Sequence, residues 1–169
     1  MSSETVSLLT RYPLFVDLTD EELRLVARIV TVRDIEAGTT IISENETGDE
    51  LYLLEDGVVD IQKTLTVMMS RSELGTKERS FVRLTGTDRC FFGEMVLFGT
   101  KERSATVRAV TRCKVFVIRD SDFLALCETN PRIGYVVLST IARIISEHLR
   151  RANNDILKLT TALSLAFSG

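Results

Sequence analysis

The sequence predicts a mainly β protein with flanking helices. We expect a small antiparallel β-barrel or jelly roll, short helices at the N-terminus and one long helix at the C-terminus. Between residues 29 and 120, short β-branched runs alternate with glycine-marked turns and no helical pattern intervenes. A helix-capping sequence precedes this region, and apolar residues spaced by three and four follow it. Many short strands with regular turns are typical of both barrels and jelly rolls.

Length and composition are those of one globular domain. The chain has 169 residues, of which 44% are hydrophobic and 27% charged, enough for a sizeable core. Its 24 acidic and 21 basic residues give a net charge of −3. Proteins that bind nucleic acid usually carry a basic excess, so we expect no nucleic-acid partner.

Cysteine usage and the N-terminus predict a cytoplasmic protein with no membrane partner. The odd number of cysteines (Cys90, Cys113 and Cys127) forms no C-x-x-C pair, which favours small apolar residues over a metal or disulfide framework. The polar start at residues 2–4 lacks the basic and apolar regions of a signal peptide. No apolar run approaches the length of a transmembrane helix.

The N-terminal segment predicts two short helices. Residues 5–11 can form the first, and Pro13 ends it, because proline disfavours helix at the residue before it. Thr19 with Glu22 three residues later matches a capping box, so the second helix should begin there and run to about Arg28. Its expected inward-facing residues are Leu23, Val26, Ala27 and Val30.

From Ile29 the pattern becomes that of strands. Glu55-Asp56-Gly57, flanked by apolar runs, predicts a hairpin with glycine at the end of the turn. Residues 69–79 are polar and predict a loop between two strands. Strands are expected at residues 30–35, 39–42, 51–54, 58–61, 64–68, 81–84, 90–92, 105–110 and 114–118.

The C-terminal region predicts helices. Ser121-Asp122 can cap a helix over residues 123–128, and Asn130-Pro131 ends it and begins the next. A continuous helix over residues 131–165 would be about 50 Å long at about 1.5 Å per residue, longer than a small barrel is wide. Residues 153–155 are poor helix formers and could bend or break it. The apolar seam is Leu138, Ile141, Ile145, Leu149, Ala152, Ile156, Leu159 and Leu163.

This seam predicts two kinds of contact. Its first half, to about Leu149, should pack on the barrel. Its second half has no barrel left to cover, and a heptad-like spacing favours a parallel homodimer. A domain-swapped or heteromeric partner remains the alternative.

The stretch from Phe92 to Val107 predicts a pocket with two polar ends. Gly93 lacks a Cβ, so a bulky group can approach the backbone, and the next residues can form one helical turn. Arg103 supplies a fork-shaped positive charge that matches a phosphate, with the hydroxyl of Ser104 beside it. Glu94 only accepts hydrogen bonds, which suits a sugar hydroxyl.

These residues resemble the phosphate-binding cassette of the cyclic nucleotide-binding domain family. The matching cassette residues are Phe92-Gly93-Glu94, Leu97, Arg103, Ala105 and Thr106. The family's earlier glycine-rich signature is similar to Gly38, Glu44, Gly48-Asp49, Leu51-Tyr52 and Gly57. The resemblance spans about residues 8–151. It implies the jelly-roll version (double-stranded β-helix) of the fold: an N-terminal helical segment 1–28, a β-barrel 29–120 with the cassette 92–107 between two strands, and C-terminal helices 121–169 for lid and dimer.

The resemblance implies a sensor that binds a 3′,5′-cyclic mononucleotide, cAMP or cGMP, without a metal. Arg103 and Ser104 would hold the cyclic phosphate, helped by N–H groups near Met95 and Val96, and Glu94 would accept from the ribose 2′-hydroxyl. Ligand binding would move the C-terminal helix, which would signal to an unidentified partner. The expected ligand-binding residues are Gly93, Glu94, Met95, Val96, Arg103, Ser104, Ala105 and Asn153.

A degenerate fold with a silent pocket, acting as a dimerisation or protein-interaction module, is the alternative. Val96 stands where the family has Ala or Gly and could crowd the anion. Residues 85–91 form a longer segment than usual, which could alter the pocket mouth. Glu94 and Arg103 could instead form a structural ion pair. Asn45 replaces a usual Gly, but asparagine tolerates positive φ.

No catalytic motif appears, so we expect no enzymatic activity. There is no phosphate-binding P-loop and no H-E-x-x-H sequence. The single histidine, His148, lies in a predicted helix, and the sequence has no nucleophile-elbow motif to accompany it. A lone histidine on a helix is more often exposed to solvent or at the edge of a packed face than catalytic. After the long helix, too few residues follow to build a helix-turn-helix domain.

Overall fold

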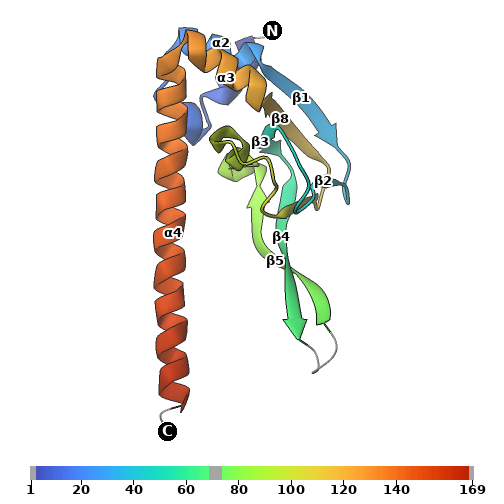
Figure 1. The fold of residues 1–169 in the computed structure, drawn as a ribbon. Helices are drawn as coiled ribbons and strands as arrows, with labels where there is room; N and C mark the ends of the chain where they lie inside the picture. The colour runs from blue at the N-terminus through green and yellow to red at the C-terminus, as the bar shows by residue number, and fades with distance from the viewer. Residues whose placement is uncertain (1–2, 69–73, 168–169) are drawn as a thin grey trace.

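Two antiparallel four-stranded sheets form the body of the protein, with helices gathered at one end and one long helix extending beyond them (Figure 1). The computed structural model describes the backbone of residues 3–68 and 74–167, and the side chains of residues 5–63 and 82–167. The helical elements, in which η marks a 3-10 helix, are α1 (Ser3–Leu9), η1 (Pro13–Phe15), α2 (Asp20–Arg28), η2 (Gly86–Asp88), η3 (Glu94–Phe98), α3 (Asp120–Thr129) and α4 (Pro131–Phe167). The strands are β1 (Val30–Ile35), β2 (Thr40–Ile42), β3 (Glu50–Asp56), β4 (Val58–Met68), β5 (Leu74–Thr85), β6 (Phe91–Phe92), β7 (Thr106–Ala109) and β8 (Cys113–Arg119).

The strand order is that of a jelly roll. One sheet has the order β1-β8-β3-β6 and the other β2-β7-β4-β5, and neighbouring strands are antiparallel. This confirms the predicted fold class and places the cassette between β6 and β7. The barrel, however, is not closed, because no ladder joins the two sheets among the described strands. The edge strands β2 and β6 have only 3 and 2 residues, too few to bridge the gap.

The predicted hairpin at Gly57 is wrong. Strands β3 and β4 flank this glycine but belong to different sheets, so Gly57 is a corner between sheets. Its φ of +94° and its close approach to the backbone of Arg112, where a Cβ would lie 2.5 Å from the carbonyl oxygen, explain why glycine is needed. A turn with glycine indicates a reversal of the chain, but the pairing partners of the strands decide which sheet they enter.

The loop predicted at residues 69–79 is also wrong over its second half. Strand β5 begins at Leu74 and pairs with β4 from Met68↔Leu74 to Val58↔Thr85. Backbone pairing with β4 therefore overrides the polar composition of residues 74–79. Residues 69–73 lie outside the described residues.

Strands β3 and β8 are apolar on both faces because each face packs against a different core. Alternate residues such as Leu53 and Phe116 pack against the helices, in one buried cluster with Val26 of α2. Their neighbours, such as Leu54 and Val117, pack between the two sheets in a second cluster. Side chains alternate between faces along a strand, so a strand buried on both sides has a continuous apolar sequence.

The N-terminal capping box is confirmed. The hydroxyl of Thr19 accepts from the backbone N–H of Glu22 at 3.3 Å, and the Glu22 carboxylate accepts from the Thr19 N–H at 2.8 Å. Helix α2 ends at Arg28, as predicted. The same Glu22 carboxylate forms an ion pair with Arg132, which ties α2 to the first turn of α4. Helix α1 begins and ends two residues before the predicted range of 5–11.

Helix α3 begins earlier than the predicted cap at Ser121-Asp122. Its first residue is Asp120, whose carboxylate accepts from the Ser121 N–H at 2.6 Å and lies 3.7 Å from the ammonium of Lys101. The preceding Arg119 makes no side-chain cap. The predicted side-chain cap is therefore absent, and the Asp120 carboxylate lies in the first turn of the helix.

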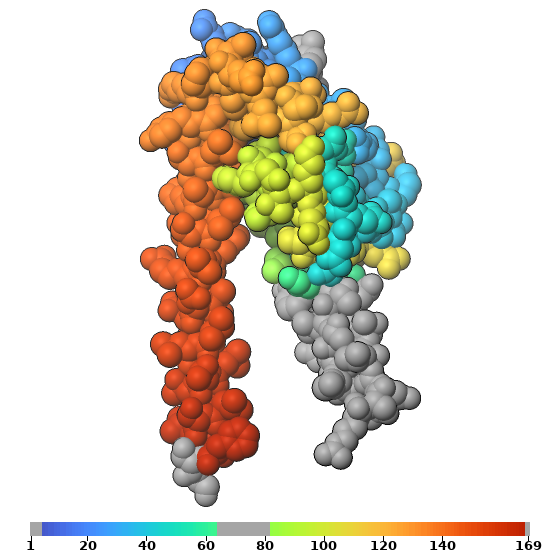
Figure 2. All heavy atoms as spheres, in the orientation of Figure 1, coloured from blue at the N-terminus to red at the C-terminus, as the bar shows by residue number. Residues whose placement is uncertain are grey.

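Helix α4 is continuous through residues 153–155, so the predicted break does not occur. Asparagine and aspartate each cost only a few tenths of a kcal/mol in a helix, about 0.7 at most, and Asp155 pairs with Lys158 one turn later at 3.4 Å. The first part of α4 buries Ile133 and Ile141. From residue 148 onward every described side chain is exposed, and Figure 2 shows this half standing clear of the coloured strands.

Candidate functional site

Arg103 occupies a narrow slot between two glycines. A Cβ at Gly48 would lie 2.2 Å from Arg103 Nε, and a Cβ at Gly93 would lie 2.7 Å from Nη1. Within the slot, Nη1 donates to the carbonyl oxygen of Gly93 at 3.2 Å and Nη2 donates to that of Glu50 at 2.9 Å. Only 8% of the Arg103 residue is exposed. The close approach predicted for Gly93 is thus made, in this structure, by the guanidinium.

The backbone of Arg103 is fixed by the loop between β2 and β3. Its N–H donates to the carbonyl of Glu46, and its carbonyl accepts from the N–H of Asn45, both at 2.9 Å. An isolated bridge between Thr47 and Glu102 continues this pairing. Asn45 has a φ of 65°, so asparagine does take the left-handed conformation that suits this turn. The earlier glycine-rich signature and the cassette therefore meet at Arg103.

Arg103 keeps its positive charge available in the slot. Its two hydrogen-bond partners are neutral carbonyls, which orient a guanidinium without cancelling its charge. The nearby Glu50 carboxylate is held by Arg33, at 3.0 and 2.7 Å, and by the hydroxyl of Tyr52 at 2.6 Å. Arg33 lowers the pKa of Glu50, and burial, followed by the Glu50 carboxylate, raises the pKa of Tyr52 to about 12. The Tyr52 ring stacks on Phe92 with centroids 5.2 Å apart.

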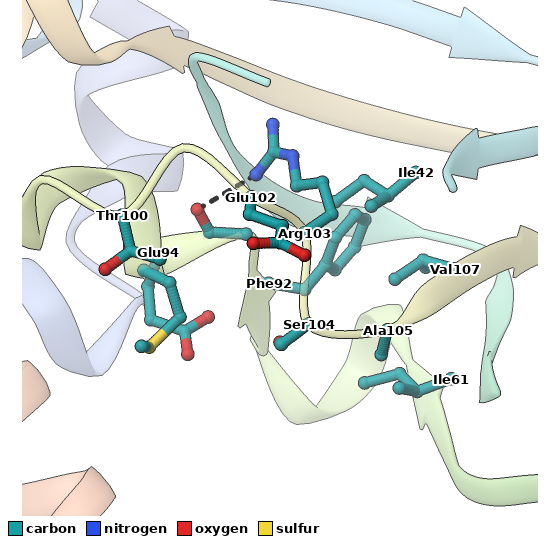
Figure 3. A pocket seen from close by; sticks show the side chains of 12 residues that line it. Ile42, Ile61, Phe92, Glu94, Thr100, Glu102, Arg103, Ser104, Ala105 and Val107 are labelled. Carbon is teal, nitrogen blue, oxygen red and sulfur yellow. Dashed lines mark hydrogen bonds between the residues drawn. The ribbon is translucent and has the colours of Figure 1, made fainter. Parts of the chain in front are cut away.

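A cavity of about 130 Å³ opens beside Arg103 (Figure 3). Its lining residues are Ile42, Ile61, Phe92, Gly93, Glu94, Met95, Thr100, Glu102, Arg103, Ser104, Ala105 and Val107. Six of the predicted site residues are therefore brought together. The Arg103 guanidinium and the Glu94 carboxylate point in opposite directions (Figure 3), and although both residues are described, no ion pair joins them. The alternative of a structural Glu94–Arg103 ion pair is thus not supported.

Two predicted site residues lie elsewhere. Val96 is only 3% exposed, and its side chain packs in the core between the first sheet and the helices. Val96 is absent from the cavity lining, so its side chain does not narrow this cavity, and the expected contact of its backbone N–H with a phosphate stays a prediction. Asn153 is exposed on the half of α4 that stands clear of the sheets, and the structure does not bring it to the cavity.

A larger apolar cavity, of about 390 Å³, lies beneath α4. Its lining residues are Pro13, Ile61, Val82, Leu84, Asp88, Arg89, Cys90, Phe91, Phe92, Glu94, Ile144, Ile145 and His148. Ile61, Phe92 and Glu94 line both cavities, so the two adjoin. The smaller cavity alone is below the roughly 300–1,000 Å³ usual for small-molecule sites, and the pair falls within that range.

The segment before the cassette forms one wall of this larger cavity. Arg89, with a φ of 50°, lies 2.6 Å from the Glu55 carboxylate, and the buried hydroxyl of Tyr12 donates to the same carboxylate at 3.0 Å. Burial, followed by this carboxylate, raises the pKa of Tyr12. The segment at residues 85–91 thus shapes the cavity wall and is tied to the N-terminal region.

Sequence reasoning missed the part that α4 contributes. Ile144, Ile145 and His148 line the cavity beneath the helix, about one and a half to two and a half turns before the predicted Asn153. The apolar seam, which includes Ile145, is the signal that α4 packs on something. Which side chains meet the cavity depends on where the helix crosses the sheets, and this crossing has no local signature.

Comparison with known proteins agrees with this arrangement. The profile of the family described as "Cyclic nucleotide-binding domain" matches residues 32–130, more than half of the chain. The chain belongs to the cyclic nucleotide-binding domain family. The match begins in β1 and ends just before α4, so it contains the whole slot of Arg103 and the first cavity.

Relatives of this cyclic nucleotide-binding domain include channel proteins and regulatory proteins. It is 32% identical over 128 residues to a putative potassium channel protein of Rhodopseudomonas palustris, covering 76% of this chain and 28% of the channel. The crystal structure of the Thermus thermophilus catabolite activator protein is similar with a TM-score of 0.71 and 30% identity, covering 88% of this chain and 63% of that one. The structure of cAMP-bound PfPKA-R has a TM-score of 0.61 and 25% identity, covering 75% and 43%. The chain therefore spans less than two thirds of the length of these relatives.

Three further features of the described residues complete this description. No group of three or more His, Cys, Asp or Glu residues among them is placed to hold a metal ion. In the same part of the chain, none of the helices combines the length and the apolar character needed to span a bilayer. The cysteines are free thiols, and burial raises the pKa of Cys90, in the wall of the larger cavity, to about 11.

Proposed function

We propose that this domain binds a 3′,5′-cyclic mononucleotide, with cAMP as the preferred ligand, and reports binding through α4. The observation that carries this proposal is Arg103: a nearly buried guanidinium that lines a cavity and donates to the neutral carbonyls of Gly93 and Glu50. Burying a charge is costly, so a site that keeps one poised at a cavity wall favours an anionic ligand.

The two adjoining cavities suggest how the nucleotide lies. The cyclic phosphate would meet Arg103 and the hydroxyl of Ser104 in the smaller cavity. Glu94 lines both cavities, so its carboxylate would accept from the ribose 2′-hydroxyl between them. The base would occupy the apolar cavity beneath α4, against Phe92 and under Ile145 and His148.

Two relatives support cAMP over cGMP. One, from Thermus thermophilus, is named cyclic AMP receptor protein, and it is 30% identical over 135 residues, 80% of this chain and 58% of its own length. The other, PfPKA-R, has a structure with cAMP bound. The hydroxyl of Ser104 alone is compatible with either base.

The position of the larger cavity supports a ligand-coupled movement of α4. A base there would contact both the sheets and the helix, so the ligand would favour the helix position that completes these contacts. The ligand can shift α4 only by its differential affinity for the two positions. The exposed half of α4 continues the helix beyond Ile145 and His148, and it would carry that change outward.

A parallel homodimer through the second half of α4 is part of this proposal. Ile156, Leu159 and Leu163 are each at least 59% exposed, and burying such a side chain contributes about 1.5–3 kcal/mol. They recur at heptad spacing from Leu149. Like charges do not oppose the pairing, because the flanking positions are Asn153, Asp155, Thr160 and Ala162.

Calorimetric titration with cAMP and then cGMP tests the binding site. We expect micromolar binding of cAMP that Arg103→Ala abolishes with folding retained. Arg108→Ala is the matched control, because Arg108 is exposed and lines neither cavity. No heat and no thermal shift at millimolar cAMP or cGMP would reject the proposal in favour of a silent pocket. Binding by Arg103→Ala as tight as that of the wild type would show that the phosphate lies elsewhere.

A further inference from the structure

Glu50 and Arg103 line a common polar cavity. This cavity, of about 200 Å³, lies on the side of Arg103 that faces the β2–β3 loop, and Tyr52 lines it as well. Arg103 Nη2 is already 2.9 Å from the carbonyl oxygen of the same Glu50. A largely buried carboxylate is therefore placed within reach of the guanidinium on which the proposed nucleotide site depends.

Arg33 on β1, and not Arg103, forms the ion pair with this carboxylate. Its two terminal nitrogens donate to the two Glu50 carboxylate oxygens at 3.0 and 2.7 Å. Such a bidentate pair fixes the orientation of the carboxylate and also compensates its charge. The Tyr52 hydroxyl donates a third hydrogen bond at 2.6 Å. Glu46 and Asp49, which also line the cavity, are exposed, so solvent screens their charges more strongly.

We propose that Arg33 is a positioning residue, which holds the Glu50 carboxylate against β1 and so leaves Arg103 free to bind an anionic ligand. This inference rests on the proposed function, because it assigns Arg33 a role in the affinity of the same site. Arg33 lies in the exposed middle of β1 and lines neither of the adjoining cavities that would hold the nucleotide.

Removal of the Arg33 charge would weaken anion binding by two routes. The Glu50 side chain could turn and pair with Arg103, which would then have to be released by the incoming phosphate. Even without turning, the carboxylate would lose its main positive partner, with only the weaker attraction of Arg119 left, and it would repel a phosphate at Arg103 across a partly buried cavity where charges are poorly screened. Glu50→Gln replaces the carboxylate with a neutral amide, so neither effect would then weaken anion binding.

The test compares the dissociation constant for cAMP among four variants of the full chain by calorimetry. We expect Arg33→Gln to bind roughly five- to tenfold more weakly than the wild type, the effect of one unscreened charge near the phosphate. Arg33→Lys, which keeps the charge, should lose less. Arg33→Gln combined with Glu50→Gln should recover affinity to within about twofold of the wild type. Arg83→Gln is the matched control, because it breaks a similar two-pronged pair with Asp60 in the other sheet.

The outcomes separate this inference from the proposed function. If the wild type binds cAMP and Arg33→Gln binds equally well, Arg33 has no positioning role and only this inference is overturned. If the double variant binds as weakly as Arg33→Gln, Arg33 acts through the fold and the inference is again overturned. If the wild type binds neither cAMP nor cGMP, the proposed function fails, and the assignment of Arg33 fails with it.

Discussion

The slot of Arg103 makes a steric prediction that needs no ligand. Gly48→Ala would place a Cβ 2.2 Å from Arg103 Nε and 2.4 Å from Nη2, whereas non-bonded heavy atoms prefer about 3.5–4.0 Å. Gly48 is not among the residues with positive φ, so alanine strains no backbone there. The guanidinium cannot shift sideways, because Gly93 closes the other wall of the slot. It must therefore leave the slot.

Leaving the slot breaks the hydrogen bonds to the carbonyls of Gly93 and Glu50. A hydrogen bond from a charged donor contributes about 1.5–3 kcal/mol, and water recovers part of this when the guanidinium becomes exposed. We therefore expect Gly48→Ala to lower the free energy of unfolding by about 2 kcal/mol, as measured by urea titration followed by circular dichroism. In an Arg103→Ala background the same substitution should cost almost nothing.

The comparison of the two backgrounds is a double-mutant cycle, so it isolates the contact between residues 48 and 103. A coupling energy of about 2 kcal/mol, which is typical of residues in contact, would support the slot geometry. An equal cost of Gly48→Ala in both backgrounds would refute it, because the alanine would then clash with something other than Arg103. No cost in either background would show that the guanidinium is not held between the glycines.

Three further predictions concern the seam, the core and pH. Ile156→Glu should convert a dimer into a monomer in sedimentation velocity, while Asn154→Glu, on the opposite face of α4, should not; a monomeric wild type would contradict the seam assignment. Val96→Ala should cost about 1–3 kcal/mol of unfolding free energy, because it removes buried methyl groups, and leave the affinity for cAMP unchanged; tighter binding at unchanged stability would instead place Val96 at the phosphate. The pKa of Glu50 is lowered by Arg33, so its contribution to stability is complete above its unfolded value of about 4.3 and is lost as the pH falls through the folded value. The difference in unfolding free energy between the wild type and Glu50→Gln should therefore shrink below about pH 4.3, and a constant difference would contradict the assignment.

Local interactions explain which predictions from the sequence succeeded. The capping box of Thr19 and Glu22 depends on residues three apart, and the structure has both of its hydrogen bonds. The cassette also depends on near neighbours, and Gly93, Glu94, Arg103 and Ser104 do line one cavity. Short-range geometry of this kind is encoded by the order of residue types, so a sequence motif can predict it.

Predictions that depended on distant partners were less successful. The turn at Gly57 does not close the expected hairpin, because β3 pairs with β6 and β8 while β4 pairs with β5 and β7. The residues of α4 near the larger cavity are Ile144 to His148, earlier in the helix than the predicted Asn153. In both cases the local sequence is compatible with the predicted and with the observed arrangement. Long-range packing decides between the two.

The sequence by itself determined the family, the mainly β class and the residue types of the phosphate end, because these follow from motifs and periodicity along the chain. Only the tertiary structure decided that Arg103 lies between Gly48 and Gly93, since this slot joins segments 55 residues apart. It also decided that Val96 belongs to the core and that Arg33 holds Glu50. A side chain's neighbours across sheets and helices come from the packing of the whole chain, and no single segment specifies them.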